Sequence, residues 1–333
     1  MAKSKNPSGK KRLRLLDPMR DGPGVEKGED TTPNLKFFFV SLKRKFWKLI
    51  TLNLIMLVQI IPLLICAYAR LAGPSTPTQY YPLYAPLLGA QTALPTSAGT
   101  TLFNLFSGLF SVPIYNTPVT WIMGGLILFH VVTYGWQKVG CTYILRNLVR
   151  GDGVFIISDF FYAIRRNLKQ GFFMGLLDCF IIFMLGFDFA YFYGAPASGL
   201  TNFMYVMIIA LAILWLIMRF YIYLMLVTFD MKIFKILKNA LIFTALGIKR
   251  NLMAILGIVV MAALSVALVV LGVQIHVYGI IIVPFLFFLA IAAFMYTYAA
   301  WPVIQRYMID PVDGGKNTQV HEPAPEDSIP EET

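Results

Sequence analysis

The chain has 333 residues, 58% of them hydrophobic, and a mean hydropathy of +0.68. One soluble domain cannot bury so much apolar surface, and the apolar residues occur in blocks of about twenty, the length of a helix that crosses a bilayer. The net charge of +11 does not indicate nucleic-acid binding, because the basic residues are spread over segments beside apolar blocks. We therefore expect an all-α integral membrane protein.

The N-terminal part is predicted to contain a tail, an interfacial segment and one span. Residues 1–36 are rich in Lys, Arg, Gly, Asp and Pro without an apolar period, which predicts a disordered basic cytoplasmic tail. Residues 36–48 mix aromatics with a dense basic cluster, a composition typical of a helix lying on an anionic leaflet. The following apolar block, residues 49–71, is long enough to span the membrane.

Residues 72–118 are predicted to form a long outer loop. No Lys, Arg, Asp or Glu occurs between Arg70 and Lys138. Between Leu102 and Phe110, apolar residues recur at helical spacing over a run too short to span, which predicts a re-entrant or surface-lying helix. A second span follows at residues 119–145.

Four more spans are predicted, at residues 171–192, 201–229, 251–271 and 278–303. The transmembrane domain then covers residues 37–309, with six spans in all. The acidic, Pro-rich tail, residues 310–333, is predicted to be a disordered cytoplasmic segment.

Two short amphipathic helices are predicted beside these spans. The first covers residues 158–168, with Ser158 as a candidate N-cap. The second follows residue 229 and carries two stripes at helical spacing. Its basic stripe consists of Lys232, Lys235 and Lys238, and its apolar stripe consists of Ile233, Ile236, Leu237 and Leu241.

The distribution of basic residues predicts the orientation. On this arrangement 26 of the 28 Lys and Arg residues lie on one side of the membrane, and only Arg70 and Arg219 do not. Because basic residues are enriched in cytoplasmic loops, six spans place both termini in the cytoplasm. An odd number of spans would scatter these charges over both faces.

A short internal repeat is visible at a shift of 84 residues. It aligns IRRNL, residues 164–168, with IKRNL, residues 248–252, and a weaker copy, LKRKF, occurs at residues 42–46. One interpretation is three parallel helical hairpins, each with a basic helix, an outgoing span and a returning span. The other is that any helix at the inner leaflet before a span looks like this.

Two charged residues, Asp178 and Arg219, fall inside consecutive spans, where charge is costly. They are interpreted either as an ion-paired gate or substrate contact, or as a structural pair that sets helix packing. His130 is a candidate proton relay or a packed polar residue. Gly171 and Gly175 form a small-xxx-small pair that permits close helix contact.

No enzyme signature is found, so we expect a protein that is not an enzyme and needs no cofactor and no metal. The cysteines have no spacing typical of a disulfide framework or a zinc site, and small apolar fillers are the expected role of Cys66, Cys141 and Cys179.

Three segments carry a family resemblance: LKRKFWKLITLNLIMLVQIIPLL, GCTYILRNLVRGDGVFIISDFFYAIRRNLKQG and VTFDMKIFKILKNALIF. They resemble the YesL-like family of bacterial polytopic membrane proteins, a domain of unknown function found mainly in Gram-positive bacteria. The resemblance extends from Phe37 to about Arg306 and implies a plasma-membrane protein of unestablished role, often encoded beside genes for carbohydrate uptake. The long uncharged outer loop departs from the shorter family members.

The leading hypothesis is a non-enzymatic accessory or regulator of carbohydrate uptake in the bacterial plasma membrane. Its expected partners are anionic lipid headgroups and carbohydrate-transporter components, without nucleic acid. The alternative hypothesis is a small-solute transporter with a midplane site near Asp178 and Arg219, and the third is a membrane enzyme. The predicted docking face consists of Lys232, Lys235, Lys238, Arg165, Arg166, Lys249 and Arg250.

Overall fold

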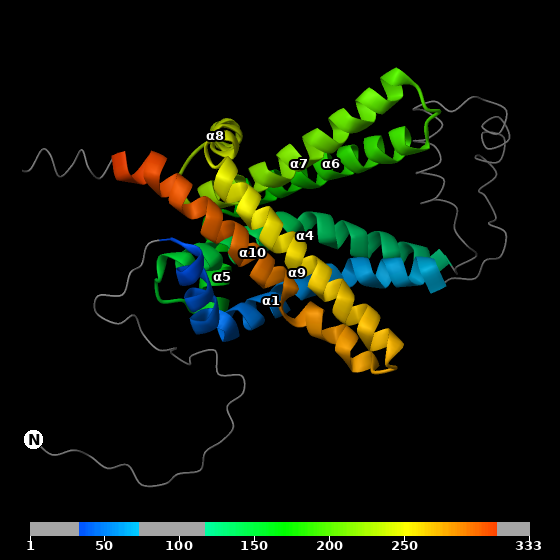
Figure 1. Ribbon diagram of the computed structural model, residues 1–333, viewed down its shortest axis with the longest axis horizontal. Coiled ribbons are helices and arrows are strands. Elements are labelled where there is room, and N and C mark those ends of the chain that lie inside the picture. Colours follow the sequence, from blue (N-terminus) through cyan, green and yellow to red (C-terminus); the bar gives the residue numbers. More distant parts are fainter. Residues whose placement is uncertain (1–32, 73–116, 312–333) are drawn as a thin grey trace, which may run out of the picture.

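A computed structural model describes residues 33–72 and 117–311 of the chain, and these residues form eight α-helices and no strand (Figure 1). Two short helical segments flank the last helix, a 3₁₀ turn at Tyr278–Ile281 and a π-helical segment at Gln305–Ile309. The α-helices are α1 (Leu35–Ala72), α4 (Thr117–Arg150), α5 (Ile156–Arg166), α6 (Leu168–Gly194), α7 (Gly199–Thr228), α8 (Ile233–Leu246), α9 (Ile248–Gln274) and α10 (Ile282–Ile304).

The protein is an all-α membrane protein. Five helices are long and apolar enough to cross a bilayer: α1, α6, α7, α9 and α10 with its π-helical extension. The remaining predicted span, residues 119–145, corresponds to α4, which has 34 residues and packs between α1 and α6. At a rise of about 1.5 Å per residue α4 is also long enough to cross, and its crossing stays a prediction.

The six long helices alternate in direction. Figure 1 shows that α1, α6 and α9 begin at the end of the bundle where α4, α7 and α10 finish, so both described chain ends lie there. The short helices α5 and α8 lie at this same end, which we call the basic end because Arg165, Arg166, Lys232, Lys235 and Lys238 occur there.

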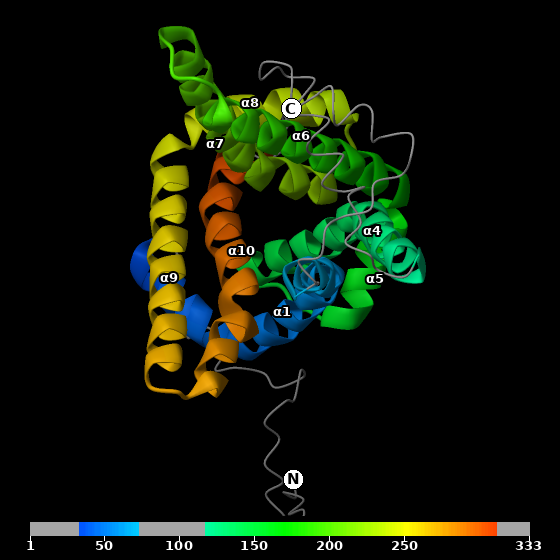
Figure 2. The same ribbon diagram turned by 90° about the vertical axis from the view of Figure 1, so that its right-hand side faces the viewer.

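The tightly packed core lies toward the basic end. Its centre is the last part of α7, where Tyr221, Ile222 and Met225 are fully buried. Toward the opposite end the helices diverge as three antiparallel pairs, α1 with α4, α6 with α7, and α9 with α10 (Figures 1 and 2). The fully buried side chains are thus concentrated in the half of the bundle that carries the basic residues.

Helix α9 lies at the periphery and packs mainly along α10 (Figure 2). Its outward face is apolar, with Leu256 65% exposed, Leu264 62% and Val266 63%. Exposing such a face to water would cost about 25 cal/mol for each Å² of apolar surface, whereas lipid removes that cost. This surface therefore fits a bilayer as solvent.

Three predicted boundaries are corrected. Helix α5 begins at Ile156, so Ser158 lies inside its first turn and is not the N-cap. Instead the Asp159 carboxylate accepts the N–H of Phe155 at 2.9 Å, which satisfies a free donor at the helix start. The interfacial segment 36–48 and the first span form one continuous helix, α1, and the last span is followed by a π-helical turn that ends at Ile309.

The two copies of the repeat are not placed identically. In the first copy the chain breaks at Asn167, between α5 and α6, whereas in the second copy it breaks at Gly247, one turn earlier in register. Asn251, which the repeat aligns with Asn167, is buried and accepts a hydrogen bond from the Tyr221 hydroxyl at 2.8 Å. The order of elements, a short helix followed by two long ones, recurs in both copies.

The predicted outer loop 72–118 and most of the two tails, 1–36 and 310–333, lie outside the described residues. The short helix expected near Leu102 falls in that part as well.

Candidate functional site

The predicted intramembrane pair is formed. Asp178 of α6 is completely buried, and Arg219 of α7 places its Nε 3.0 Å from both carboxylate oxygens. Trp215 Nε1 donates to Asp178 Oδ1 at 3.0 Å, and the Tyr223 hydroxyl donates to Oδ2 at 3.0 Å. Each carboxylate oxygen therefore has donors from more than one side chain, as a buried charge requires.

The network extends to a third helix. The Arg219 guanidinium donates to the Tyr134 hydroxyl of α4. The Lys138 ammonium, one turn along α4, lies 5.5 Å from the centroid of the Tyr134 ring. The pair thus connects α4, α6 and α7 in the same layer of the bundle.

This arrangement leaves Asp178 with no free acceptor for a solute, because a substrate would have to displace Trp215, Tyr223 or Arg219. Arg219 is different, since its side chain is 22% exposed. The Asp178 carboxylate is thus fully engaged within the protein, whereas the Arg219 guanidinium keeps one partly exposed edge.

Close helix contact beside the pair depends on glycine. A Cβ built on Gly135 of α4 would lie 2.8 Å from the Cα of Gly175 and in direct collision with the Gly171 carbonyl. Any larger residue at position 135 would force α4 and α6 apart. The small-xxx-small pair Gly171 and Gly175 is therefore a helix contact, with Gly135 as its partner on α4.

His130 of α4 is a packed polar residue. Its Nδ1 lies 2.8 Å from the Gln59 carbonyl of α1, and the Gln59 amide donates to the His130 carbonyl at 2.9 Å. Thr133 donates to Gln59 Oε1 at 3.1 Å. These bonds join α1 to α4, and among residues 33–72 and 117–311 no acidic side chain is bonded to His130.

Asn53 of α1 is a buried polar residue that hydrogen-bonds to the backbone of α10. Its amide donates to the Phe285 carbonyl at 2.6 Å, and its Oδ1 accepts the N–H of Ala290 at 3.0 Å. The side chain bridges a carbonyl and an N–H five residues apart in α10. Both bonds satisfy the amide of a buried Asn in an apolar span, where an unpaired polar side chain would be costly.

A buried arginine at the basic end was not singled out by the sequence. Arg146 of α4 is 8% exposed and donates to the Val227 carbonyl at 2.8 Å, in the last turn of α7. It also donates to Asn147 Oδ1 at 2.9 Å and lies 4.6 Å from the centroid of the Tyr143 ring. A cation at the negative end of a helix dipole is stabilising, so Arg146 acts as a C-terminal partner of α7.

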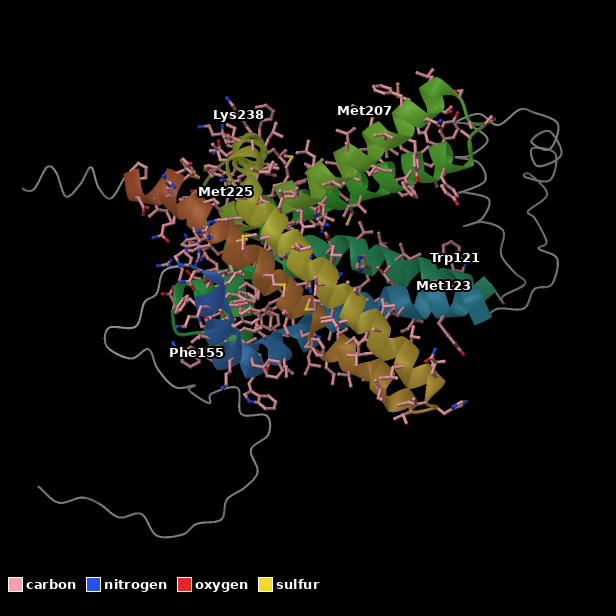
Figure 3. The ribbon with its side chains drawn as sticks, viewed as in Figure 1. Trp121, Met123, Phe155, Met207, Met225 and Lys238 are labelled. Carbon is pink, nitrogen blue, oxygen red and sulfur yellow. The ribbon has the colours of Figure 1, made fainter. Side chains whose placement is uncertain are left out.

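The predicted docking face is divided between two places. On α8 the side chains of Lys232, Lys235 and Lys238 are exposed, and Figure 3 shows Lys238 pointing away from the bundle. Figure 1 shows α8 nearly end-on, so it runs across the direction of α7 and α9. Lys249 is exposed and Arg250 is half-buried at the start of α9.

The apolar stripe of α8 is partly corrected. Ile236 is fully buried, and Ile233 and Leu237 are half-buried, but Leu241 is 49% exposed. Phe234 is 79% exposed beside the lysines. Exposed lysine and aromatic side chains on a helix that lies across the bundle are typical of the membrane interface.

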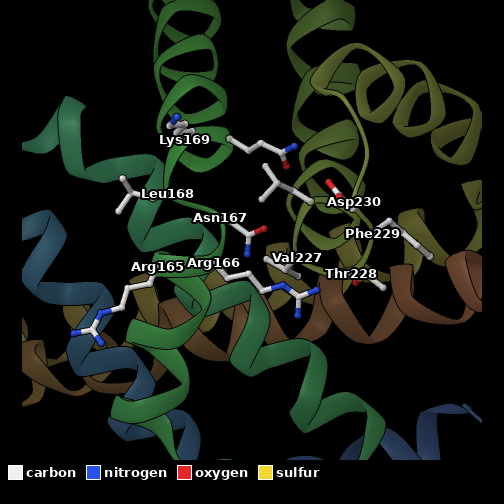
Figure 4. A pocket seen from close by; sticks show the side chains of 11 residues that line it. Arg165, Arg166, Asn167, Leu168, Lys169, Val227, Thr228, Phe229 and Asp230 are labelled. Carbon is white, nitrogen blue, oxygen red and sulfur yellow. The ribbon is translucent and has the colours of Figure 1, made fainter.

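The other part of the docking face lines a cavity. Arg165 and Arg166, at the end of α5, belong to the lining of a cavity of about 460 Å³ at the α5–α6 and α7–α8 junctions (Figure 4). The rest of its polar lining consists of Asn167, Lys169, Gln170, Thr228 and Asp230. The sequence does not show this cavity, because its walls come from segments about sixty residues apart.

Within residues 33–72 and 117–311, no group of three or more His, Cys, Asp or Glu side chains is placed to hold a metal ion. The three cysteines are free thiols, with Cys66 and Cys141 buried. Comparison with protein-family models, with curated proteins and with solved structures gives no match.

The partners of the ion pair could have been found from one signal. Trp215, Arg219 and Tyr223 are four residues apart, so they lie on one face of α7 and present three donors in a row. Tyr134 has the same spacing to Lys138 on α4. The cavity and the Arg146 contact give no such local signal, since their partners lie on other helices.

Proposed function

We propose that this protein is a non-enzymatic accessory protein of the bacterial plasma membrane, whose basic end lies in the cytoplasm and docks a partner. The single observation that carries the proposal is α8, where Lys232, Lys235 and Lys238 are all exposed beside Phe234. These lysines take no part in the contacts of α8 with the core, which are made by buried side chains such as Ile236 and Phe243.

The proposed partner is a component of carbohydrate uptake. The support for this choice is the resemblance of the three quoted segments to the YesL-like family, which stays a prediction. The physical support is the charge alone, because three exposed lysines on one helix face favour an acidic partner surface or anionic lipid.

A second candidate function is transport of a small solute past Asp178 and Arg219. The observation in its favour is the partly exposed guanidinium of Arg219 in the middle of α7. Against it, every oxygen of Asp178 is already hydrogen-bonded. Uptake by purified protein in liposomes distinguishes the two functions. A carrier takes up the solute and loses this flux when Arg219 is replaced by Gln, whereas an accessory protein shows no uptake.

The test of docking uses charge reversal on α8. A variant with Lys232→Glu, Lys235→Glu and Lys238→Glu is compared with the native chain by photo-crosslinking in intact membranes, followed by identification of the crosslinked proteins. We expect a transporter component to be captured by the native chain and at least tenfold less by the variant.

The matched control reverses three basic residues on α1, Lys36, Lys43 and Lys48, which changes the net charge by the same amount. If docking depends on α8, this control retains most of the crosslink. Equal loss in both variants would show a general effect of charge at the leaflet, and no captured transporter component with the native chain would refute the proposal.

A further inference from the structure

The cavity at the basic end has two walls of opposite electrical character (Figure 4). One wall is the end of α5 and the beginning of α6, and the other is the end of α7 and the segment that leads to α8. Because α6 and α7 are antiparallel, the positive end of one helix dipole and the negative end of the other meet across this cavity.

The α6 wall presents cationic groups. Figure 4 shows the Arg166 side chain extending across the cavity toward Val227 and Thr228, whereas Arg165 turns away toward the outside. Lys169 lies on the same wall, and no side chain caps the first turn of α6, since the Asn167 amide donates backward to the Ala163 carbonyl at 3.0 Å. A guanidinium beside an uncapped helix N-terminus favours a phosphate group.

The α7 wall presents the opposite charge. Asp230 follows the last turn of α7, its side chain is exposed, and no ion pair to it is formed within the described part of the chain. The Val227 carbonyl in this turn is already occupied by Arg146. Asp230 is therefore the group on this wall that can receive an ammonium.

We propose that this cavity binds a zwitterionic ethanolamine phosphate group, with the phosphate at Arg166 and the α6 N-terminus and the ammonium at Asp230. A simple anion would meet Asp230, and a simple cation would meet Arg166 and Lys169, so a group with both charges fits both walls. A cavity of about 460 Å³ lies in the usual range for small-molecule sites.

The same chemistry has two sources, the headgroup of phosphatidylethanolamine and free phosphoethanolamine. Either is compatible with a cavity at the basic end of a membrane protein. The inference does not rest on the docking function, because the lysines of α8 do not line this cavity. Its test therefore leaves the α8 residues unchanged.

The experiment is native mass spectrometry of the full-length protein, purified free of lipid and mixed with equal amounts of phosphatidylethanolamine, phosphatidylglycerol and phosphatidylcholine. We expect phosphatidylethanolamine to be retained at least tenfold more than phosphatidylglycerol. Phosphatidylcholine is expected to bind more weakly than phosphatidylethanolamine, because its quaternary ammonium has no N–H to donate to Asp230.

The variants are Arg166→Gln and Asp230→Asn, and each is expected to lower retention of phosphatidylethanolamine about tenfold, the loss of one charge-assisted contact. Lys43→Gln is the matched control, since Lys43 of α1 is an exposed basic residue outside the lining of this cavity, and its variant is expected to bind within twofold of the native chain. All three side chains are exposed, and an unchanged melting temperature confirms that each variant is folded.

A second arm distinguishes the sources. Free phosphoethanolamine that displaces the bound lipid, or that binds where the lipid does not, supports the site and identifies its ligand, provided that inorganic phosphate at the same concentration has no such effect. Equal retention of phosphatidylglycerol, or an Asp230→Asn variant that binds like the native chain, would overturn the proposal and leave only an anion site.

Discussion

Gly135 of α4 and Gly175 of α6 pack backbone against backbone, since a Cβ at position 135 would lie 2.8 Å from the Gly175 Cα. This contact leaves no room for a side chain between α4 and α6 at these positions. Asp178 lies one turn beyond Gly175 on α6, and Tyr134 precedes Gly135 on α4. The glycine contact is therefore what brings Tyr134 within reach of the Asp178–Arg219 pair.

Replacing Gly135 with Ala is expected to destabilise the protein by about 1–3 kcal/mol, the usual cost of overpacking a close contact. The measurement is the melting temperature of the purified protein in detergent. Gly186→Ala on α6 is the matched control, because no atom lies within 4 Å of its added Cβ and alanine favours a helix. An equal decrease in both variants would contradict the role of the glycine contact.

Replacing Asp178 with Asn is expected to cost about 3 kcal/mol, because it leaves the largely buried Arg219 guanidinium in an apolar span without its carboxylate. Arg219→Gln is expected to cost a similar amount, and the double variant less than the sum of the two. The three melting temperatures form a double-mutant cycle. If the two losses simply add, the residues are not coupled and the structural role of the pair is wrong.

Replacing Arg146 with Leu is expected to destabilise the protein by about 1.5–3 kcal/mol, because the Val227 carbonyl then loses its charged donor at the end of α7. Arg150→Leu is the comparison, since Arg150 forms an exposed ion pair with Asp152 at 3.2 Å, and such pairs contribute about 0–1 kcal/mol. Chemical unfolding in mixed micelles measures both. A larger loss for Arg150→Leu would reverse the assignment.

The proposed orientation predicts which ends of the bundle are open to the outside of the cell. In a chain whose three cysteines are replaced by alanine, a single cysteine at position 238 is expected to react with a membrane-impermeant thiol reagent only after the cells are opened. A cysteine at position 197, between α6 and α7, is expected to react in intact cells. The reverse pattern would place the basic end outside and refute cytoplasmic docking.

The helices were predictable because their signals are local. Every predicted span within the described residues corresponds to a long helix, and the basic residues occur at one end of the bundle. The boundaries differ by a few residues except at the start of α1, which begins at Leu35 because the predicted interfacial segment is continuous with the first span. The misplaced N-cap at Ser158 has a physical cause. Asp159 at the next position offers a carboxylate to the Phe155 N–H, so the helix begins two residues earlier.

The candidate site was predictable in part. Asp178 and Arg219 stood out because a charge in an apolar span is costly, and consecutive spans are antiparallel neighbours. Their hydrogen-bond partners Trp215 and Tyr223 are ordinary residues in an apolar helix, and only their spacing from Arg219 relates them to the pair. Ile236 of the predicted apolar stripe of α8 is buried, but Leu241 is exposed, and Ala240 and Phe243 face the core beside Ile236.

The amino-acid sequence by itself determined the number and order of the long helices, their membrane character and the end at which the basic residues gather. Block length, hydropathy and charge are properties of each segment, and the insertion and orientation of each segment in the bilayer depend on them. The tertiary structure decided that Gly135 meets Gly175, that Arg146 meets the end of α7, and that Arg166 and Asp230 share one cavity. Those contacts depend on how each helix is rotated and crossed against the others, which packing sets between residues far apart in the chain.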